Sequence, residues 1–291
     1  MIRRQKRNAV RRGKAARGMV LIAVLWMVAA LSVLVTGLAY TVRQEVRLAS
    51  MSRQVLLASA AADGAIHLVI QSLKLKPVLP SQSSSTTISY AGIPVRVRVL
   101  PLNGLIDINN APKDLLVNLL VVAGRMARPL AEGVAQTLVE MRSLKDKRGA
   151  VLGFEASEDL MSVPGIDYDV YARLAPLITA DLRGTGKINP LSADADVLLV
   201  LANGNIDQAR LVATGRDAGA VGIDTSALNA AFVSVAPIPR ISFEASVDLA
   251  DGNVVQHTRT VDMGGNSREG MAWRTIRTKS RLVRVPKQIS G

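Results

Sequence analysis

Few residues in this sequence form a pattern typical of a catalytic or metal-binding site. The 291 residues include no cysteine, which excludes disulfides, thiol nucleophiles and thiolate metal sites. The two histidines, His67 and His257, lie far apart in the sequence, and neither belongs to a spacing typical of a metal site or a catalytic triad. We therefore expect ordinary structural roles for both histidines, no cofactor and no enzymatic activity.

A short turn at Pro164 and Gly165 separates two segments of helical character, residues 158–163 and 171–178. This is a helix-hairpin-helix pattern, and in its DNA-binding versions the backbone amides of the turn hold a phosphate. Carboxylates surround the turn here: Glu155, Glu158, Asp159, Asp167 and Asp169. Because carboxylates repel phosphate, we expect the hairpin to pack against protein. A membrane-anchored DNA-binding or DNA-uptake protein is the alternative.

Two asparagine-containing phrases frame this hairpin. The first places Asn109 and Asn110 before Pro112, and the second places Asn189 shortly before Ser192. Each phrase precedes an apolar helical pattern. The Asn110 or Ser192 side chain can accept a hydrogen bond from a helix N-terminus, and proline suits the first helical position. The sequence therefore predicts two similar capped helix starts.

The basic charge of the chain, +13 at neutral pH, is concentrated near the two ends. Eight arginines and lysines and no acid precede Met19, and six basic residues lie in the last twenty. A nucleic-acid-binding domain usually gathers such residues on one folded face. The charge distribution therefore indicates a basic leader and a basic tail, and nucleic acid is not the expected partner.

Residues 19–42 carry no charge and would span about 36 Å as a helix, enough to cross the hydrocarbon core of a membrane. Beyond them, apolar residues recur at intervals of three and four up to Leu73, which predicts that the same helix continues. Lys76-Pro77 would end it. The basic residues before the span place the N-terminus in the cytoplasm and the remainder outside it.

Two simpler interpretations of this N-terminal region remain open. One is a secretory signal peptide cut after Ala39, which would release the rest of the chain. The other is an uncleaved signal anchor. The apolar stretch is long for a signal peptide, and the helical pattern continues past the possible cut after Ala39.

The junction of Gly18 with Met19 and the apolar helix that follows resemble the class III signal of type IV pilins and type II secretion pseudopilins. This resemblance implies that a prepilin peptidase cuts after Gly18 and methylates the new terminal amine of Met19. Most members have glutamate at the fifth mature position, which is Ala23 here. Minor pseudopilin K characteristically lacks that glutamate and sits at the fibre tip. The two asparagine motifs and the hairpin between them also resemble its helical domain.

Alternating apolar residues predict strands at 88–100, 241–249 and 254–263, with a further candidate at 271–285. The expected fold is α+β: a long N-terminal transmembrane helix packed on a small antiparallel sheet, with an inserted all-helical domain. The predicted boundaries are a cleaved leader at 1–18, the long helix at 19–76, the sheet at 86–102 and 230–291, and the inserted domain at 103–215.

The resemblance to pseudopilin K implies a minor pseudopilin that nucleates or caps the periplasmic pseudopilus of a type II secretion system. Its expected partners are other minor pseudopilins, the major pseudopilin, the prepilin peptidase and the inner-membrane assembly platform. Its expected location is the bacterial inner membrane, with most of the chain in the periplasm. Some members carry an acidic, calcium-binding run after the first asparagine motif. The corresponding stretch here, residues 140–148, is net positive, and we expect no calcium site.

Overall fold

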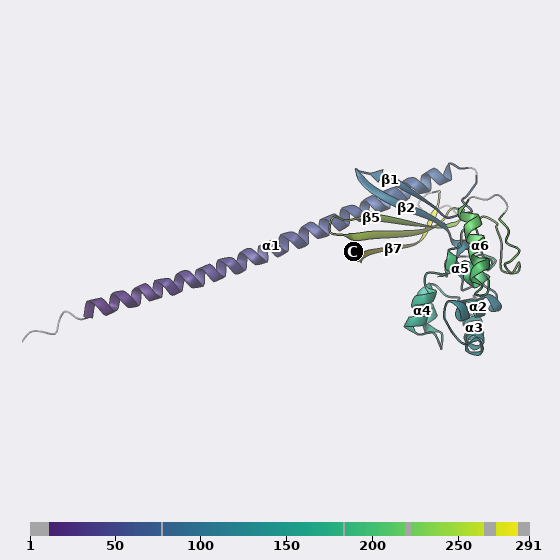
Figure 1. Ribbon diagram of the computed structural model, residues 1–291, viewed down its shortest axis with the longest axis horizontal. Coiled ribbons are helices and arrows are strands. Elements are labelled where there is room, and N and C mark those ends of the chain that lie inside the picture. The colour runs from purple at the N-terminus through teal and green to yellow at the C-terminus, as the bar shows by residue number, and fades with distance from the viewer. Residues whose placement is uncertain (1–11, 77, 183, 219–222, 265–271, 285–291) are drawn as a thin grey trace, which may run out of the picture. The chain divides into compact units, whose positions relative to one another are not determined.

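The computed structural model describes residues 12–76, 78–182, 184–218, 223–264 and 272–284 (Figure 1). The α-helices are α1 (Arg12–Lys74), α2 (Lys113–Val122), α3 (Arg128–Arg142), α4 (Tyr168–Leu174), α5 (Ala195–Leu201) and α6 (Ile206–Asp217). The strands are β1 (Ser84–Tyr90), β2 (Ile93–Pro101), β3 (Ile106–Asp107), β4 (Ile178–Thr179), β5 (Arg240–Asp248), β6 (Asn253–Asp262) and β7 (Arg274–Arg284). Two 3₁₀ helices, η1 (Leu102–Gly104) and η2 (Ser157–Ser162), complete the order. The predicted α+β class is confirmed.

Helix α1 begins at Arg12, within the predicted leader, and continues without interruption for 63 residues. Among the described residues, those up to Leu57 form one unit and those from Ala58 onward form a second. In the first unit, Met19–Thr36 has a mean hydropathy of 2.6 and none of it is buried in the protein. It is therefore long and apolar enough to cross a membrane.

The sheet of the second unit has five antiparallel strands in the order β1-β2-β5-β6-β7. The single strand predicted at 88–100 is wrong, because the structure has two strands there, β1 and β2. The chain instead reverses at Ala91 and Gly92, both with positive φ, so that Ser84 pairs with Val99. A two-residue turn of this kind matches the twist of a hairpin.

One face of the sheet packs on the last turns of α1. Valines and Phe243 of β2, β5 and β6 are buried on that face, opposite the small residues Ala58, Ala62 and Ala65 of α1. The close approach is clearest at Gly64, because a Cβ atom there would overlap the ring of Tyr90. Figure 1 shows this end of α1 alongside β1, β2 and β5.

The segment between β2 and β5 has its own hydrophobic core. Its fully buried members include Ile106, Leu116, Leu138, Leu174 and Val212. A short parallel pairing of β3 with β4 joins the start of this segment to the strand after α4. Before β5, turns at 226–232 carry the buried side chains of Leu228 and Phe232 into this core.

Candidate functional site

Asn109 ties together three segments that are distant in sequence. Its side-chain Nδ2 donates to the carbonyl oxygens of Phe154 at 2.9 Å and Ala180 at 3.3 Å, and its Oδ1 accepts from the amide of Phe154 at 2.7 Å. The side chain therefore acts as a backbone amide would in a strand pairing. It fixes loop 151–155 beside the end of β4.

Asn110 does not cap a helix, which corrects the prediction. Its Nδ2 donates to Oδ2 of Asp107 at 2.7 Å, and the Asp107 carboxylate also accepts from the amide of Asn109. Helix α2 begins after Pro112, which occupies the N-cap position and contributes no side-chain cap. The two asparagines instead donate hydrogen bonds to the buried carboxylate of Asp107. Burial raises the pKa of Asp107, while its bonds to Asn109 and Asn110 and the charge of Arg142 oppose that rise.

The second motif also stabilises loops and does not cap its helix. Asn189 donates through Nδ2 to the carbonyl oxygen of Ser81 at 2.8 Å and accepts from the amide of Leu191 at 3.0 Å. Ser192 donates to Oδ1 of Asn103 at 3.2 Å, and α5 begins later, after Asp194. Asn189 thus connects the segment between β2 and β5 to the link before β1, whereas the contacts of Asn109 and Asn110 lie within that segment.

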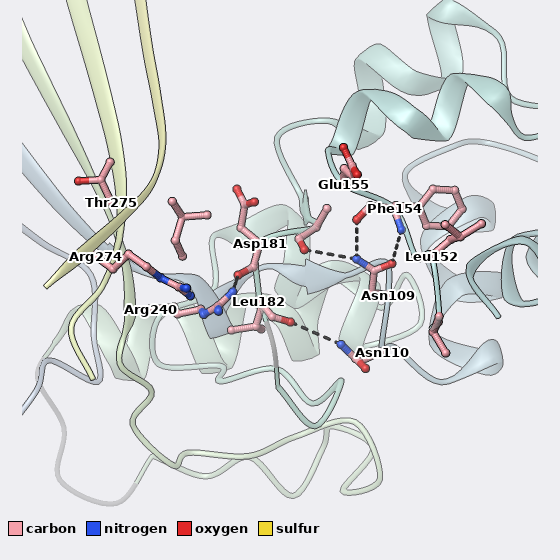
Figure 2. Close-up of a pocket in the computed structure, with 14 residues that line it drawn as sticks. Asn109, Asn110, Leu152, Phe154, Glu155, Asp181, Leu182, Arg240, Arg274 and Thr275 are labelled. Carbon is pink, nitrogen blue, oxygen red and sulfur yellow. Dashed lines mark hydrogen bonds between the residues drawn. The ribbon is translucent and has the colours of Figure 1, made fainter. Parts of the chain in front are cut away.

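A cleft of about 740 Å³ opens beside the first motif (Figure 2). Asn109 and Asn110 line it together with loop 151–155, residues 180–182, Arg240 and the first residues of β7. Arg240 hydrogen bonds to the carbonyl oxygen of Asp181 and lies 3.4 Å from Asp262. Arg274 also lies 3.8 Å from Asp262, and the Asp181 carboxylate accepts from Arg277. These charged lining residues therefore pair with neighbours outside the lining, and the cleft offers amide and carbonyl groups for binding.

The turn of the helix-hairpin-helix pattern packs against α3. Gly165 has a φ of +92°, and a Cβ atom there would lie 2.8 Å from Cγ2 of Val134. Asp167 caps α4 by accepting from the amide of Val170 at 2.8 Å. Asp159 accepts from the amides of Glu155 and Ala156. The first arm of the hairpin is the 3₁₀ helix η2. Asp159 thus binds amides at the start of this arm, and Asp167 binds an amide at the start of α4.

The two histidines are neighbours in the structure, which the sequence interpretation missed. His67 of α1 and His257 of β6 both lie beside Asp63, at 3.5 Å and 3.2 Å, and Arg259 donates to Asp63 and to Nε2 of His67. The His257 nitrogens have no aligned hydrogen-bond partner. Burial lowers the pKa of His257, an effect that Arg259 and His67 reinforce and Asp63 opposes.

A signal for this cluster is present in the sequence. His257 and Arg259 alternate with valines on the buried face of β6, so the enclosed guanidinium needs an acidic or other polar partner on the opposing element. Between Glu45 and Asp107 the sequence contains a single acid, Asp63. The guanidinium of Arg259 supplies the positive charge of the group.

The predicted processing residues lie in the first unit. Gly18 and Met19 are consecutive residues of α1, and Met19 and Ala23 are both exposed. In residues 140–148, where some pseudopilins are acidic, Glu140 accepts from Gln136 and Asp146 accepts from the amides of Arg148 and Ala150.

No model of a known family matches the chain, and no curated protein matches it. Among solved structures, it is similar to a chain of the GspK–GspI–GspJ complex from the type 2 secretion system of enterotoxigenic Escherichia coli. The two share 16% sequence identity and a TM-score of 0.53, over 81% of this chain and 99% of that chain. The fold is that of a pseudopilin. The resemblance indicated by the leader and the asparagine motifs is thereby confirmed at the level of the fold.

The segment between β2 and β5 is attached to the five-stranded sheet by charged contacts. Arg98 donates to Asp194 at 2.7 Å, and Arg277 donates to both oxygens of Asp181. Lys279 lies 2.5 Å from Glu158, which lowers the pKa of that carboxylate. The acids that surround the hairpin therefore include one that binds the sheet.

Proposed function

We propose that this chain is a minor pseudopilin of a type II secretion system, held in the inner membrane by the first part of α1. The observation that carries the proposal is the continuity of α1. One helix contains an exposed apolar stretch, Met19–Thr36, and continues into a segment that packs on a pseudopilin-like sheet. A subunit of that form can be anchored in lipid before assembly and can pack in a fibre afterwards.

The basic leader and the span orient the chain with its N-terminus in the cytoplasm and residues from Ala58 onward in the periplasm. A prepilin peptidase would cut between Gly18 and Met19 and methylate the Met19 amine. This step would remove the part of α1 before Met19 and leave the apolar stretch at the mature N-terminus.

Ala23 supports a position at the fibre tip. A carboxylate inside lipid is costly unless it is paired, and in ordinary subunits the glutamate at this position would pair with a neighbour's terminal amine. A subunit with alanine makes no such pair and does not require a partner above it. The similar chain belongs to a complex of GspK, GspI and GspJ, and we propose equivalents of the other components of that complex as partners of this chain.

The alternative, a DNA-binding protein that uses the hairpin, is not favoured. The turn at Gly165 faces Val134 of α3, and Asp167 accepts from the amide of Val170. An approaching phosphate would meet carboxylates on either side of the turn.

The proposed position can be tested by locating an epitope-tagged chain on pseudopili in its native host. We expect label at fibre ends for the unchanged protein, and label along the shaft for Ala23→Glu, whose carboxylate can pair with a neighbouring amine. Ala23→Gln has a similar size without the charge and should stay at the ends. Even labelling along fibres by the unchanged protein would refute the tip position.

A further inference from the structure

The outer face of the sheet, defined as the face turned away from α1, carries polar residues in cross-strand rows. One row joins Arg96, Ser246, Gln256 and Arg281 through the pairings of β2, β5, β6 and β7. The next row joins Arg98, Glu244, Thr258 and Lys279, and a third joins Leu100, Ser242, Thr260 and Arg277. Residues in the same row lie side by side, so the side chains of each row form one line across the four strands.

The segment between β2 and β5 covers one end of this outer face. In the third row Leu100, Ser242 and Thr260 are buried, and Arg277 pairs with Asp181. In the second row, Lys279 pairs with Glu158 of η2, and Arg98 pairs with Asp194 next to α5. Each of these cations therefore meets a carboxylate that the covering segment supplies.

The first row lies beyond the reach of that segment. Arg96 and Arg281 are exposed, and within the described residues neither forms an ion pair with a carboxylate. Arg281 donates to the side-chain oxygen of Gln256 at 2.8 Å. A shallow hollow of about 180 Å³ lies between the two arginines and is lined by Ser85, Ser246, Gln256 and Thr258, among others.

We propose that this first row is a docking surface for another protein that presents carboxylates. On the same face, the covered cations are each matched by a carboxylate from a packed protein segment, and Arg96 and Arg281 offer the same chemistry to a separate molecule. Three strand intervals place their Cα atoms about 14 Å apart. Two carboxylates on one extended segment of the partner fit that spacing. The polar backbone between them can bind the hydroxyl and amide groups of the hollow.

The charges around the row favour separate carboxylates over a continuous phosphate chain. Glu244 lines the same hollow, 3.8 Å from Arg98, and Asp248 lies at the open end of β5 beside Pro94 and Arg96. A nucleic acid laid across the strands would bring its phosphates near both acids. A protein segment can place its acids opposite the arginines alone.

The test uses the full chain in detergent and a fluorescent peptide in which glutamate alternates with serine, with binding followed by anisotropy at several salt concentrations. The comparison variants are Arg96→Glu/Arg281→Glu and, as a control with the same change of net charge, Arg128→Glu/Arg210→Glu on the exposed surfaces of α3 and α6. Thermal unfolding of each variant checks that the fold is kept. A peptide with glutamine in place of glutamate and a single-stranded DNA of equal length complete the set.

We expect salt-sensitive binding of the glutamate peptide that falls at least tenfold in Arg96→Glu/Arg281→Glu and by less than twofold in the control. The glutamine peptide and the DNA should bind more weakly than the glutamate peptide. The proposal is overturned if the unchanged chain does not bind the glutamate peptide, if both variants lose binding equally, or if DNA binds more tightly. If Arg96→Glu/Arg281→Glu unfolds, Arg96→Gln/Arg281→Gln replaces it with the same criteria.

Discussion

Asp63 of α1 and Arg259 of β6 join the helix to the sheet through an ion pair with Nη2 and Oδ1 at 2.5 Å. The arginine side chain is 15% exposed and the aspartate 34% exposed. The pair is therefore partly screened by solvent, but the arginine is too enclosed to regain full hydration if its partner is removed. This contact holds the C-terminal part of α1 in register with β6.

Asp63→Asn should destabilise the second unit by about 1–3 kcal/mol, because it leaves the Arg259 guanidinium enclosed without a countercharge. Chemical denaturation of the full chain in detergent, followed by tryptophan fluorescence in a Trp26→Phe background so that Trp273 gives the signal, measures the change. Asp207→Asn, at an exposed position of α6, is the matched control and should cost less than about 0.5 kcal/mol. Equal losses from the two variants would show that Asp63 is an ordinary surface acid.

His257 should make the stability depend on pH below its ordinary pKa of 6.5. Its folded-state pKa is lowered, so the unfolded chain binds a proton first as the pH falls. The stability contributed by neutral His257 is therefore present above pH 6.5 and is lost on acidification through the folded-state pKa. The slope is at most about 1.4 kcal/mol per pH unit for this one proton.

Unfolding measured between pH 7.5 and 5 tests this, with His257→Gln as the comparison. The glutamine variant should show a smaller loss of stability over that range. A slope unchanged by the substitution would assign the acid sensitivity to other groups.

Asn109→Ala should cost about 2–4 kcal/mol, because it leaves the amide and carbonyl of Phe154 and the carbonyl of Ala180 without their partner. Asn110→Ala should cost less, since its main contact is the bond to Asp107. Asn118→Ala on α2 serves as the control. Denaturant midpoints give the ranking, and an Asn109→Ala variant as stable as Asn118→Ala would contradict the proposed role.

A comparison of Gly165→Ala with Gly149→Ala separates the loss of stability caused by backbone strain from the loss caused by a steric clash. Both glycines have positive φ, +92° and +81°, so alanine should cost about 1 kcal/mol at either. Only Gly165 has a neighbour in the path of the new methyl group, Cγ2 of Val134 at 2.8 Å. We expect Gly165→Ala to lower the melting temperature several degrees more than Gly149→Ala. Equal shifts would mean that the hairpin is not held against α3.

Periodicity in the sequence predicted the main framework of the fold. The three- and four-residue spacing to Leu73 predicted one continuous helix, and the alternation around Phe243 and Val255 predicted two strands of the sheet. These patterns are informative because the buried face of a helix takes residues three or four apart, and the buried face of a strand takes every second residue. Chain reversal at Ala91 and Gly92 was missed, since it depends on pairing of Ser84 with Val99 and not on a strong local turn signal.

The contacts of the polar residues could not be predicted from local pattern. Asn109 and Asn110 do occur where the chain turns, but their partners are Phe154, Ala180 and Asp107, and two of these lie far along the chain. His67 and His257 were judged isolated because their shared neighbour, Asp63, is apparent only when α1 is placed on β6. Long-range packing determines these contacts.

The central claim is that α1 is the N-terminal helix of a processed pseudopilin. Mass spectrometry of the N-terminal peptide from membrane-extracted protein in its native host tests this most directly. We predict a mature chain that begins at N-methylated Met19, after removal of the leader that ends in Gly18. A chain that begins at Tyr40, or one that retains Met1, would contradict it.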